Sequence, residues 1–434
     1  MTTHADVVVL GAGPAGAAVA RRLAAAGASV AVVTGAPPAA AREGFSRRTR
    51  ERLLEEGLDE AVAALEGPVP RSGRWGAERA VEGLEWLADR ARVARALEAG
   101  VVRAGVTRVA GPATRVARTA SGYAVESAAG RVEARLVVDA RGRRGPQSRG
   151  PLLLALGRSF AHASGRPATR IAPWSRGWCW LADDGERVFV QVVGAARGAT
   201  RPVEWFAAAA AEVEGLGAIL AAPPVGALAA RPAHARLGRE SPDAGVWRVG
   251  DAALALDPLS GQGVYEALRG ATVVAAALAT VLEGGDALLA ARFVAERYRE
   301  TWSRAVATAA RFYAENAAQG AFWTATAAAY AALVAPAAAG PARIERRPVL
   351  EDGRIRERAV LVTPAAPRGA WHVAGVPLVA LLELVGDAAP AAPAILDAAR
   401  RLDRPPAAVE TALAWLKASG ALAAPRGASL SSGV

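Results

Sequence analysis

The chain of 434 residues is long enough for two or three domains, and 52% of its residues are hydrophobic, enough for a substantial core. Its single cysteine, Cys179, excludes an intramolecular disulfide. The 52 basic residues outnumber the 41 acidic ones, and every basic residue except Lys417 is arginine. This excess either attracts an anionic partner or simply disperses the protein, and no arginine-rich tract with interleaved aromatic residues points to nucleic acid.

The first 34 residues have the pattern of a βαβ unit. An apolar run at 6–10 leads into the segment GAGPAG at 11–16, and apolar residues at helical spacing follow. A second apolar run at 29–33 is typical of a buried parallel strand. A glycine-rich segment between such elements predicts a dinucleotide-binding fold, whereas the segment alone would be a weak signal.

The glycines of this segment have separate roles in a dinucleotide site. Gly11 permits a tight turn, Gly13 lets a diphosphate approach the backbone, and Gly16 lets the helix pack closely on the strand. The helix N-terminus supplies N–H groups and a positive dipole for the phosphates. We therefore expect a cofactor to contact Gly11, Gly13, Pro14, Ala15 and Gly16.

The end of the second predicted strand departs from the usual dinucleotide pattern. Thr34 stands where an acidic residue usually binds the adenosine ribose. A threonine hydroxyl can still bind a ribose hydroxyl, but the missing carboxylate leaves the choice between FAD and NAD to other segments. Thr34 is also the one departure that favours a non-catalytic protein using this fold to recognise a partner.

Residues 178–193 predict a hairpin with an aromatic face. Trp178 and Trp180 alternate onto one side of a strand, and a turn at Asp184-Gly185 leads into the apolar run 188–193. The two tryptophans either form the wall of a substrate pocket or pack in the core.

A second glycine-rich loop follows an apolar stretch that ends at Gly250-Asp251. The loop contains Pro258 and ends at Gly261-Gln262-Gly263, where a long alanine-rich helix is predicted to begin and to run into the 280s. A helix N-terminus beside this loop stabilises a negatively charged group.

The longest uncharged run, residues 316–342, reaches membrane-spanning length. Its alanines are interrupted by polar residues and two prolines, which favours a buried or partner-facing helix over a membrane span. The first predicted strand begins after five residues, so we expect no signal peptide and predict a cytoplasmic protein.

The C-terminal part predicts a hairpin around Asp352-Gly353 and three short helices at about 376–386, 391–402 and 406–419. Strands followed by three helices indicate a small winged-helix-like module. Because no basic recognition helix is present, docking of a peptide or a structural cap is preferred over DNA binding.

Four segments, in the same order along the chain, resemble FAD-dependent oxidoreductases of the para-hydroxybenzoate hydroxylase type, a superfamily that includes geranylgeranyl reductases and flavin-dependent tryptophan halogenases. The segments are residues 11–16, 86–90, 136–143 and 249–263. The resemblance implies an α/β fold with a glutathione-reductase-type Rossmann FAD domain, an inserted mixed β-sheet substrate domain and a small winged-helix-like C-terminal domain. The expected domains are residues 1–150 with 245–345 for FAD, 151–244 for the substrate, and 346–434 at the C-terminus.

The same resemblance implies which residues contact FAD. Asp251 holds the ribityl hydroxyls, Pro258 and the glycines after it line the isoalloxazine ring, and Arg90 points at the cofactor. Reduced flavin is anionic around its pyrimidine ring, so a helix N-terminus at Gly263 suits it. The full implied set is Arg42, Arg90, Asp139, Gly142, Gly250, Asp251, Pro258, Gly261, Gln262 and Gly263.

The choice of reaction is narrowed by a missing lysine. Halogenases of this superfamily use a lysine between the first glycine motif and a WxWxIP motif, but this chain has no lysine there and its WCW segment lacks the Ile-Pro ending. Hydroxylation of an aromatic group with dioxygen remains, as does transfer of a hydride to a double bond. The four histidines lack metal-ligand spacing, so we predict no metal site, and we name no catalytic side chain.

A narrower resemblance is to the flavoprotein maturases of tryptophylquinone enzymes, which hydroxylate a tryptophan within a precursor polypeptide. It is closest to the type that matures the cysteine tryptophylquinone subunit of quinohemoprotein amine dehydrogenase. It rests on the spelling DPLSGQG at 257–263, on residues 42–46 and 85–90, and on Phe312-Tyr313 with Phe322-Trp323. A small acidic protein or peptide substrate would suit the basic chain.

The sequence leaves alternatives for the substrate, the reaction and the electron donor. The substrate could instead be a small aromatic molecule, or the enzyme could resemble a flavin-dependent halogenase or a geranylgeranyl reductase in its chemistry. The electron donor is NAD(P)H or a separate flavin reductase, because the chain lacks a second dinucleotide fingerprint.

Overall fold

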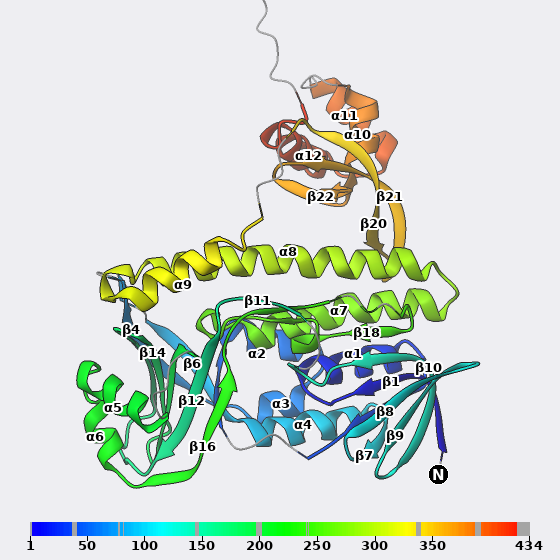
Figure 1. Ribbon diagram of the computed structural model, residues 1–434. Helices are drawn as coiled ribbons and strands as arrows, with labels where there is room; N and C mark the ends of the chain where they lie inside the picture. Colours follow the sequence, from blue (N-terminus) through cyan, green and yellow to red (C-terminus); the bar gives the residue numbers. More distant parts are fainter. Residues whose placement is uncertain are drawn as a thin grey trace, which may run out of the picture. The chain divides into compact units, whose positions relative to one another are not determined.

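The computed structural model describes residues 2–36, 41–76, 79–80, 82–143, 147–196, 202–239, 241, 243–335, 340–386 and 392–422. The chain forms two compact units (Figure 1). The larger comprises Met1–Leu282 and Arg297–Val334, and the smaller comprises Glu283–Glu296 and Ala335–Val434. Each unit has a hydrophobic core of its own.

The predicted Rossmann sheet lies in the larger unit. In spatial order its strands are β7 (Thr107–Ala110), β2 (Val30–Thr34), β1 (Thr2–Leu10), β10 (Gly130–Asp139), β9 (Gly122–Ser127) and β8 (Ala113–Thr119), and β18 (Val246–Arg248) pairs with the end of β10. The first four strands and β18 run parallel, whereas β9 and β8 turn back antiparallel. This order confirms the expected nucleotide-binding fold.

The parallel strands are apolar and buried on both faces of the sheet. Val7, Val8 and Val9 of β1 are completely buried. Helix α1 (Pro14–Ala25) connects β1 to β2 and packs against α4 (Arg90–Arg103) and α7 (Gly263–Leu282). The sheet and its helices thus bring the loops after β1, β10 and β18 to one edge, where a ligand can bind.

A second, nine-stranded sheet is mixed, as expected for the substrate-binding part. Its order is β16 (Pro224–Pro232), β12 (Leu153–Phe160), β15 (Val188–Ala195), β14 (Gly177–Asp183), β13 (Ala168–Trp174), β4 (Glu66–Trp75), β6 (Gly83–Asp89) and β3 (Arg42–Ser46), with β5 (Arg79–Ala80) beside β4. The β13–β4 pair is parallel and the other pairs are antiparallel. The predicted hairpin of β14 and β15 is confirmed.

Shorter elements complete the larger unit. They are α2 (Arg47–Glu55), α3 (Asp59–Ala63), the three-stranded sheet β11 (Gln147–Arg149), β17 (Arg236–Gly238) and β19 (Leu254–Ala255), α5 (Pro202–Glu212), α6 (Leu216–Ala221), and the 3₁₀ turns η1 (Gly250–Ala252), η2 (Pro258–Ser260) and η3 (Ala317–Gln319). Strands β3, β4 and β6 join the nine-stranded sheet from residues 42–89, far in sequence from the other strands. The three expected domain boundaries therefore stay a prediction.

The uncharged run at 316–342 was expected to be a buried or partner-facing helix, and only part of it is helical. The long helix α8 (Ala287–Ala314) ends before it, the turn η3 follows, and α9 occupies only Ala321–Ala331. Gly320 separates the turn from α9 with a φ of 142°, a backbone conformation that side chains disfavour. Residues 336–339 of the run lie outside the described part of the chain.

The smaller unit has the predicted hairpin and three helices. Strands β20 (Arg343–Glu351), β21 (Arg354–Thr363) and β22 (Ala366–Ala370) form one sheet, β23 (His372–Val373) pairs with β24 (Val376–Pro377), and the helices are α10 (Leu378–Val385), α11 (Ala392–Leu402) and α12 (Pro406–Ala418). Asp352 and Gly353 both have positive φ, as a tight hairpin turn requires. The expected apolar face of α12 is buried in the core of this unit.

By length and composition, α7 could cross a membrane, and it is the one such helix among the described residues. Half of its most apolar window is buried inside the protein. The core helix of a globular protein passes the same test, so this helix is weak evidence for a span.

Candidate functional site

Three of the segments singled out in the sequence meet at the carboxyl ends of the parallel strands. The backbone N–H of Ala140 donates to the carbonyl of Leu10 at 3.0 Å, and the N–H of Val249 donates to the carbonyl of Asp139 at 3.1 Å. The loops after β1, β10 and β18 therefore lie side by side. Ligands of open α/β sheets bind at this edge.

Two glycines of the first loop are required by backbone contacts. Gly11 has a φ of 104°, and a Cβ there would lie 2.8 Å from the carbonyl oxygen of Ala140. A Cβ on Gly16 would collide with the carbonyl oxygen of Gly11. Both crowding atoms belong to the backbone, so neither can move aside cheaply. Gly16 thus allows the close approach of helix and strand that its motif predicts.

The N-terminus of α1 fits an anionic group. Gly13 is the N-cap, and within the described structure no side chain caps the helix and its first turn carries no acidic residue. A Cβ on Gly13 would meet no described atom within 4 Å, which leaves room for a ligand beside Pro14 and Ala15. Thr34 is half-buried at the end of β2, the neighbouring strand.

Asp139 ends β10 and is held in place by an arginine of its own segment. The Nε and Nη2 atoms of Arg141 each lie 2.9 Å from a different carboxylate oxygen of Asp139. Burial alone would raise the pKa of Asp139, but the hydrogen bonds and charge of Arg141 hold this pKa below its ordinary value. Gly142 follows with a φ of 77°, so the chain turns sharply after the strand.

Arg143, to which the sequence assigned no role, joins the second loop to the third. Its Nε donates to Asp251 at 3.0 Å, its Nη1 to the carbonyl of His234 at 2.8 Å, and its Nη2 to the carbonyl of Leu256 at 3.2 Å. One planar guanidinium therefore fixes the Asp251 carboxylate relative to the loop that follows.

Gly250 packs the third loop onto α1. Its φ is 61°, and a Cβ on it would lie 2.9 Å from the Cβ of Ala15. The loop residues Gly250 and Asp251 therefore stand directly over the first turn of α1. The residues expected to hold the diphosphate and those expected to hold the ribityl chain are brought together.

The DPLSGQG loop has one buried end and one exposed end. Asp257 and Leu259 are buried, whereas Gly261, Gln262 and Gly263 are exposed. Among the described atoms, none would lie within 4 Å of a Cβ on Gly261 or Gly263. The exposed end, at the start of α7, leaves a surface that a flat ring could approach.

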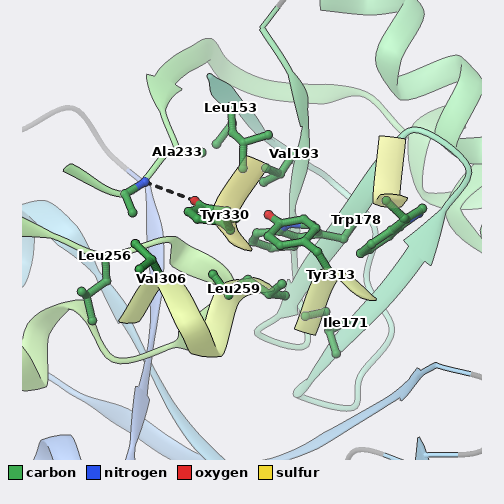
Figure 2. Close-up of a cluster of buried hydrophobic side chains, with 14 of the residues drawn as sticks. Leu153, Ile171, Trp178, Val193, Ala233, Leu256, Leu259, Val306, Tyr313 and Tyr330 are labelled. Carbon is green, nitrogen blue, oxygen red and sulfur yellow. Dashed lines mark hydrogen bonds between the residues drawn. The ribbon is translucent and has the colours of Figure 1, made fainter. Parts of the chain in front are cut away.

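The buried end centres on Asp257, which is 3% exposed. Its Oδ2 accepts hydrogen bonds from the hydroxyls of Tyr330 at 2.7 Å and Tyr313 at 3.1 Å, and its Oδ1 accepts one from the N–H of Leu259 at 2.9 Å. Figure 2 shows both tyrosines beside Leu259 and Trp178 in this cluster. The indole N–H of Trp178 donates to the Tyr313 hydroxyl at 3.3 Å, and the N–H of Ala235 donates to Tyr330 at 3.4 Å.

Burial dominates the electrostatics of this cluster. It raises the pKa of Asp257 above its ordinary value, although the three hydrogen bonds to the carboxylate oppose the shift. It also raises the pKa of Tyr313 and of Tyr330, and the charge of Asp257 adds to both shifts. The two tyrosines therefore stay protonated and act as donors.

Trp178 and Trp180 lie on one side of β14, as their alternation predicts. Trp178 is 3% exposed in the core beneath α8 and α9, and Trp180 is partly exposed and meets Phe189 edge to face at 6.2 Å. Cys179 points into a different core cluster, where burial raises the pKa of its thiol to about 12. This thiol stays protonated and unreactive at neutral pH.

Arg42 and Arg90 form a separate group at the edge of the nine-stranded sheet. Arg42 pairs with Asp89 across β3 and β6, next to Arg90. The Arg42 guanidinium forms ion pairs with Glu66 at 2.8 Å and with Asp184. The Nε of Arg90 lies 3.1 Å from Glu43. Carboxylates thus hold both arginines, and their contact with a cofactor stays a prediction.

The fold and this strand-end cluster define the class of the protein. An uncapped helix N-terminus, a carboxylate fixed by Arg143 and an open loop at a second helix fit the diphosphate, ribityl and ring parts of FAD, respectively. Among the described residues, no group of three or more His, Cys, Asp and Glu could hold a metal ion. The protein is an FAD-dependent oxidoreductase of the monooxygenase type.

Comparison with solved structures identifies the family. The chain is 31% identical to the peptidyl tryptophan dihydroxylase QhpG, essential for tryptophylquinone cofactor biogenesis, over 97% of this chain and 100% of that one, with a TM-score of 0.82. It therefore belongs to the family of flavoprotein monooxygenases that QhpG represents. No protein-family model and no curated protein matches the chain.

More distant structures share the fold. The flavin-dependent halogenase CmlS has 17% identity over 93% of this chain and 92% of its own, with a TM-score of 0.72. PqsL of Pseudomonas aeruginosa, solved with 2-aminobenzoylacetate, has 20% identity over 76% of this chain and 100% of its own, with a TM-score of 0.57. At this identity the likeness concerns architecture alone.

Sequence reasoning missed the residues that join the motifs. Arg143 ends the segment at 136–143 and Asp257 begins the loop at 257–263, but the sequence assigned a role to neither residue. Tyr330 lies in an alanine-rich helix without any motif. One feature of the sequence could have indicated this cluster, namely that Asp257 is a carboxylate in an otherwise apolar stretch directly before the glycine loop.

Proposed function

We propose that the protein is an FAD-dependent monooxygenase that hydroxylates a tryptophan side chain of a small acidic protein or peptide during the biogenesis of a tryptophylquinone cofactor. The observation that carries the proposal is the full-length likeness, at 31% identity, to a peptidyl tryptophan dihydroxylase. The more general part of the proposal is hydroxylation of an aromatic group, which is the chemistry of this class of flavoproteins.

In this proposal the strand-end cluster binds the cofactor. The first turn of α1 holds the diphosphate, and Thr34 reaches the adenosine ribose. Asp251, oriented by Arg143, accepts the ribityl hydroxyls. Bound FAD supplies the redox chemistry with dioxygen. The N-terminus of α7 stabilises negative charge on the ring that Pro258, Gly261, Gln262 and Gly263 line.

The substrate side is formed by the nine-stranded sheet. Trp180 of β14 is partly exposed and offers aromatic surface on one face of this sheet, whereas Trp178, on the same face, packs in the core. An indole packs favourably edge to face on such an exposed ring. The apolar surroundings exclude water from the reacting groups. The net charge of +11 would draw an acidic polypeptide to the protein and orient it before docking.

The experiment combines the purified protein, FAD, a reductant, isotopically labelled dioxygen and an acidic peptide with one tryptophan. Mass spectrometry should find labelled oxygen on the tryptophan. A peptide with phenylalanine in its place is the matched control and should stay unmodified. Oxidation of the reductant without oxygen in any aromatic substrate would overturn the proposal and point to reductase-like chemistry.

The electron donor is tested in the same assay. We infer that NAD(P)H docks transiently or that a separate flavin reductase supplies the electrons, since no second dinucleotide fingerprint is present in the chain. Anaerobic bleaching of bound FAD by NADH or NADPH alone indicates the first route. Bleaching only after a flavin reductase is added indicates the second.

A further inference from the structure

We propose that Arg71 and Glu85 form the polar part of the substrate site. Glu85 accepts the indole N–H of the tryptophan to be hydroxylated, and Arg71 donates to a carboxylate of the same polypeptide. The inference rests on the proposed function, because it takes a tryptophan of an acidic polypeptide as the substrate. It names the two side chains that distinguish this substrate from other aromatic groups.

One face of the nine-stranded sheet is turned toward the DPLSGQG loop. Trp75 of β4 and Ile171 of β13 lie on this face, where they share a hydrophobic core cluster with Leu259 of the loop. Arg71 precedes Trp75 by four residues, in a part of β4 that pairs with β13. Because the side chains of a strand point alternately to its two sides, Arg71 lies on the face of the sheet that carries Trp75.

Glu85 of β6 lies on the same face, next to Arg71. In the register of β4 and β6, Arg71 is opposite Gly83 and Val69 is opposite Glu85. The side chains of Arg71 and Glu85 are therefore diagonal neighbours. Trp180 of β14 shares this face, and both Trp180 and Arg71 are half-buried. A ligand can therefore reach this part of the face, in contrast to the closed core beside it.

Polar atoms on this face lack the partners that buried polar groups require. Glu85 is 8% exposed, and its Oε2 has no hydrogen-bond donor in the described part of the chain. The Nε of Arg71 and the hydroxyl of Thr169, the residue opposite it in β13, are buried without a partner there as well. Such groups cost free energy. A ligand that brings a donor to Glu85 and an acceptor to Arg71 removes two of these costs.

The fold keeps room for the carboxyl group of Glu85. Strands β3 and β6 pair antiparallel, which brings Gly44 beside Glu85. A Cβ on Gly44 would collide with Oε1 of Glu85 and lie 3.1 Å from its Oε2. Gly44 thus leaves free the space that this carboxyl group occupies. The segments 42–46 and 85–90, both singled out in the sequence, meet at this point.

The chemistry of the two groups fits a tryptophan in an acidic polypeptide. An indole has one N–H donor and no acceptor, so a tryptophan that enters an apolar site needs an acceptor for this N–H. Phenylalanine has no such donor and leaves Glu85 without a partner. The guanidinium of Arg71 suits a carboxylate, and the net charge of +11 attracts the same acidic polypeptide.

The first test measures how tightly the full-length oxidised holoenzyme binds an acidic tryptophan peptide, by calorimetry. A second peptide has a benzothienyl ring, in which sulfur replaces the indole N–H and the shape is kept. We expect the wild type to bind the tryptophan peptide about tenfold more tightly, because the sulfur analogue leaves Glu85 without a donor. Glu85→Met should bind both peptides equally, and Glu85→Gln, which keeps an acceptor oxygen, should retain part of the preference. Equal affinities in the wild type, or no binding of either peptide, would overturn the inference.

Arg74 provides a matched control for Arg71. It lies three residues further along β4, on the opposite face of the sheet, and it is exposed. Arg71→Gln should weaken binding of the acidic peptide about tenfold and reduce its dependence on salt, whereas Arg74→Gln should change neither. A peptide with amides in place of its carboxylates should bind the wild type and Arg71→Gln alike. Equal losses in the two arginine variants would contradict the role of Arg71.

Unfolding experiments separate binding of a substrate from a structural role. Removal of a buried polar group that lacks a partner also removes its desolvation cost, so Glu85→Met should keep or raise the Tm of the peptide-free holoenzyme. A lower Tm would show that the protein itself needs this carboxyl group, and it would overturn the inference. If the wild type prefers the tryptophan peptide but no labelled oxygen enters any aromatic substrate, the proposed function fails while the binding site stands.

Discussion

The GAGPAG turn and the Asp257 cluster both belong to the candidate site, but they are built in opposite ways. The turn is made of consecutive residues whose backbone must approach other backbone closely, as the contact of Gly16 with the carbonyl of Gly11 requires. The cluster is made of side chains from β14, the loop before α7, α8 and α9, joined by hydrogen bonds. Local geometry explains the first region, and long-range packing explains the second.

The two regions should differ in the substitutions that they tolerate. A backbone contact leaves no room for any side chain, so the turn should fail abruptly when a Cβ is added. A hydrogen-bonded cluster loses one partner at a time, and its loss is graded by the number of buried donors left unpaired. Substitutions in each region, with a matched control, test whether the losses are abrupt in the turn and graded in the cluster.

The largest effect is expected for Gly16→Ala. The new Cβ would collide with the carbonyl oxygen of Gly11, so the turn must open, and we expect a loss of more than about 3 kcal/mol in the free energy of unfolding. Urea unfolding followed by circular dichroism measures it. Gly13→Ala is the control: the site is open and its φ of −67° suits alanine, so stability should be kept while FAD binding weakens. Similar destabilisation by both would contradict the steric account.

Asp257→Asn should have the next largest effect. An amide has one oxygen for three buried donors, so either the tyrosine hydroxyls or the Leu259 N–H must face its NH₂ group. We expect about 2 kcal/mol of destabilisation. The half-exposed Asp251→Asn is the control and should affect FAD binding more than stability. A more stable Asp257→Asn protein would show instead that the cost of burying the charge dominates.

A smaller effect is expected for Arg143→Lys. A lysine keeps the charge, but one ammonium cannot meet the three acceptors that the guanidinium joins at fixed angles. We expect FAD affinity to fall about tenfold, because Asp251 loses its fixed orientation. Titration of the apoprotein with FAD, followed by flavin fluorescence, gives the dissociation constant. Unchanged affinity would mean that Arg143 supports the loops without orienting Asp251.

The smallest effect is expected for Asp139→Asn, and it should depend on pH. The pKa of Asp139 in the folded protein lies below its ordinary value of 3.8, so its ion pair contributes stability above that pH. This contribution disappears as the pH falls through the depressed pKa. At neutral pH the variant should lose about 1 kcal/mol or less, and at the acid end of a Tm series it should match the wild type. A difference that stays constant down to the lowest pH would argue against this linkage.

Much of the fold could be predicted because its signals are local. Apolar runs at 6–10 and 29–33 became parallel strands, and the DG turn at 352–353 closed the hairpin of the smaller unit. The uncharged run at 316–342 was expected to be a helix, but composition does not reveal that this helix begins only after Gly320, its N-cap, and ends at Ala331. A mixed β-sheet was expected for the substrate domain. Its strands from residues 42–89 were not predicted to join this sheet, because they are far in sequence from the other strands.

The positions where the backbone must come close to a neighbour or a ligand follow from the sequence, because glycine is the residue type that permits this and its spacing is visible. The order of the motifs also indicates the class of cofactor. The fold in space was needed to show that Arg143 holds Asp251, that Asp257 joins Tyr313 and Tyr330, and that Tyr313 contacts Trp178. Such side chains carry no spacing rule, because a buried carboxylate recruits its donors from whichever segments the fold packs around it.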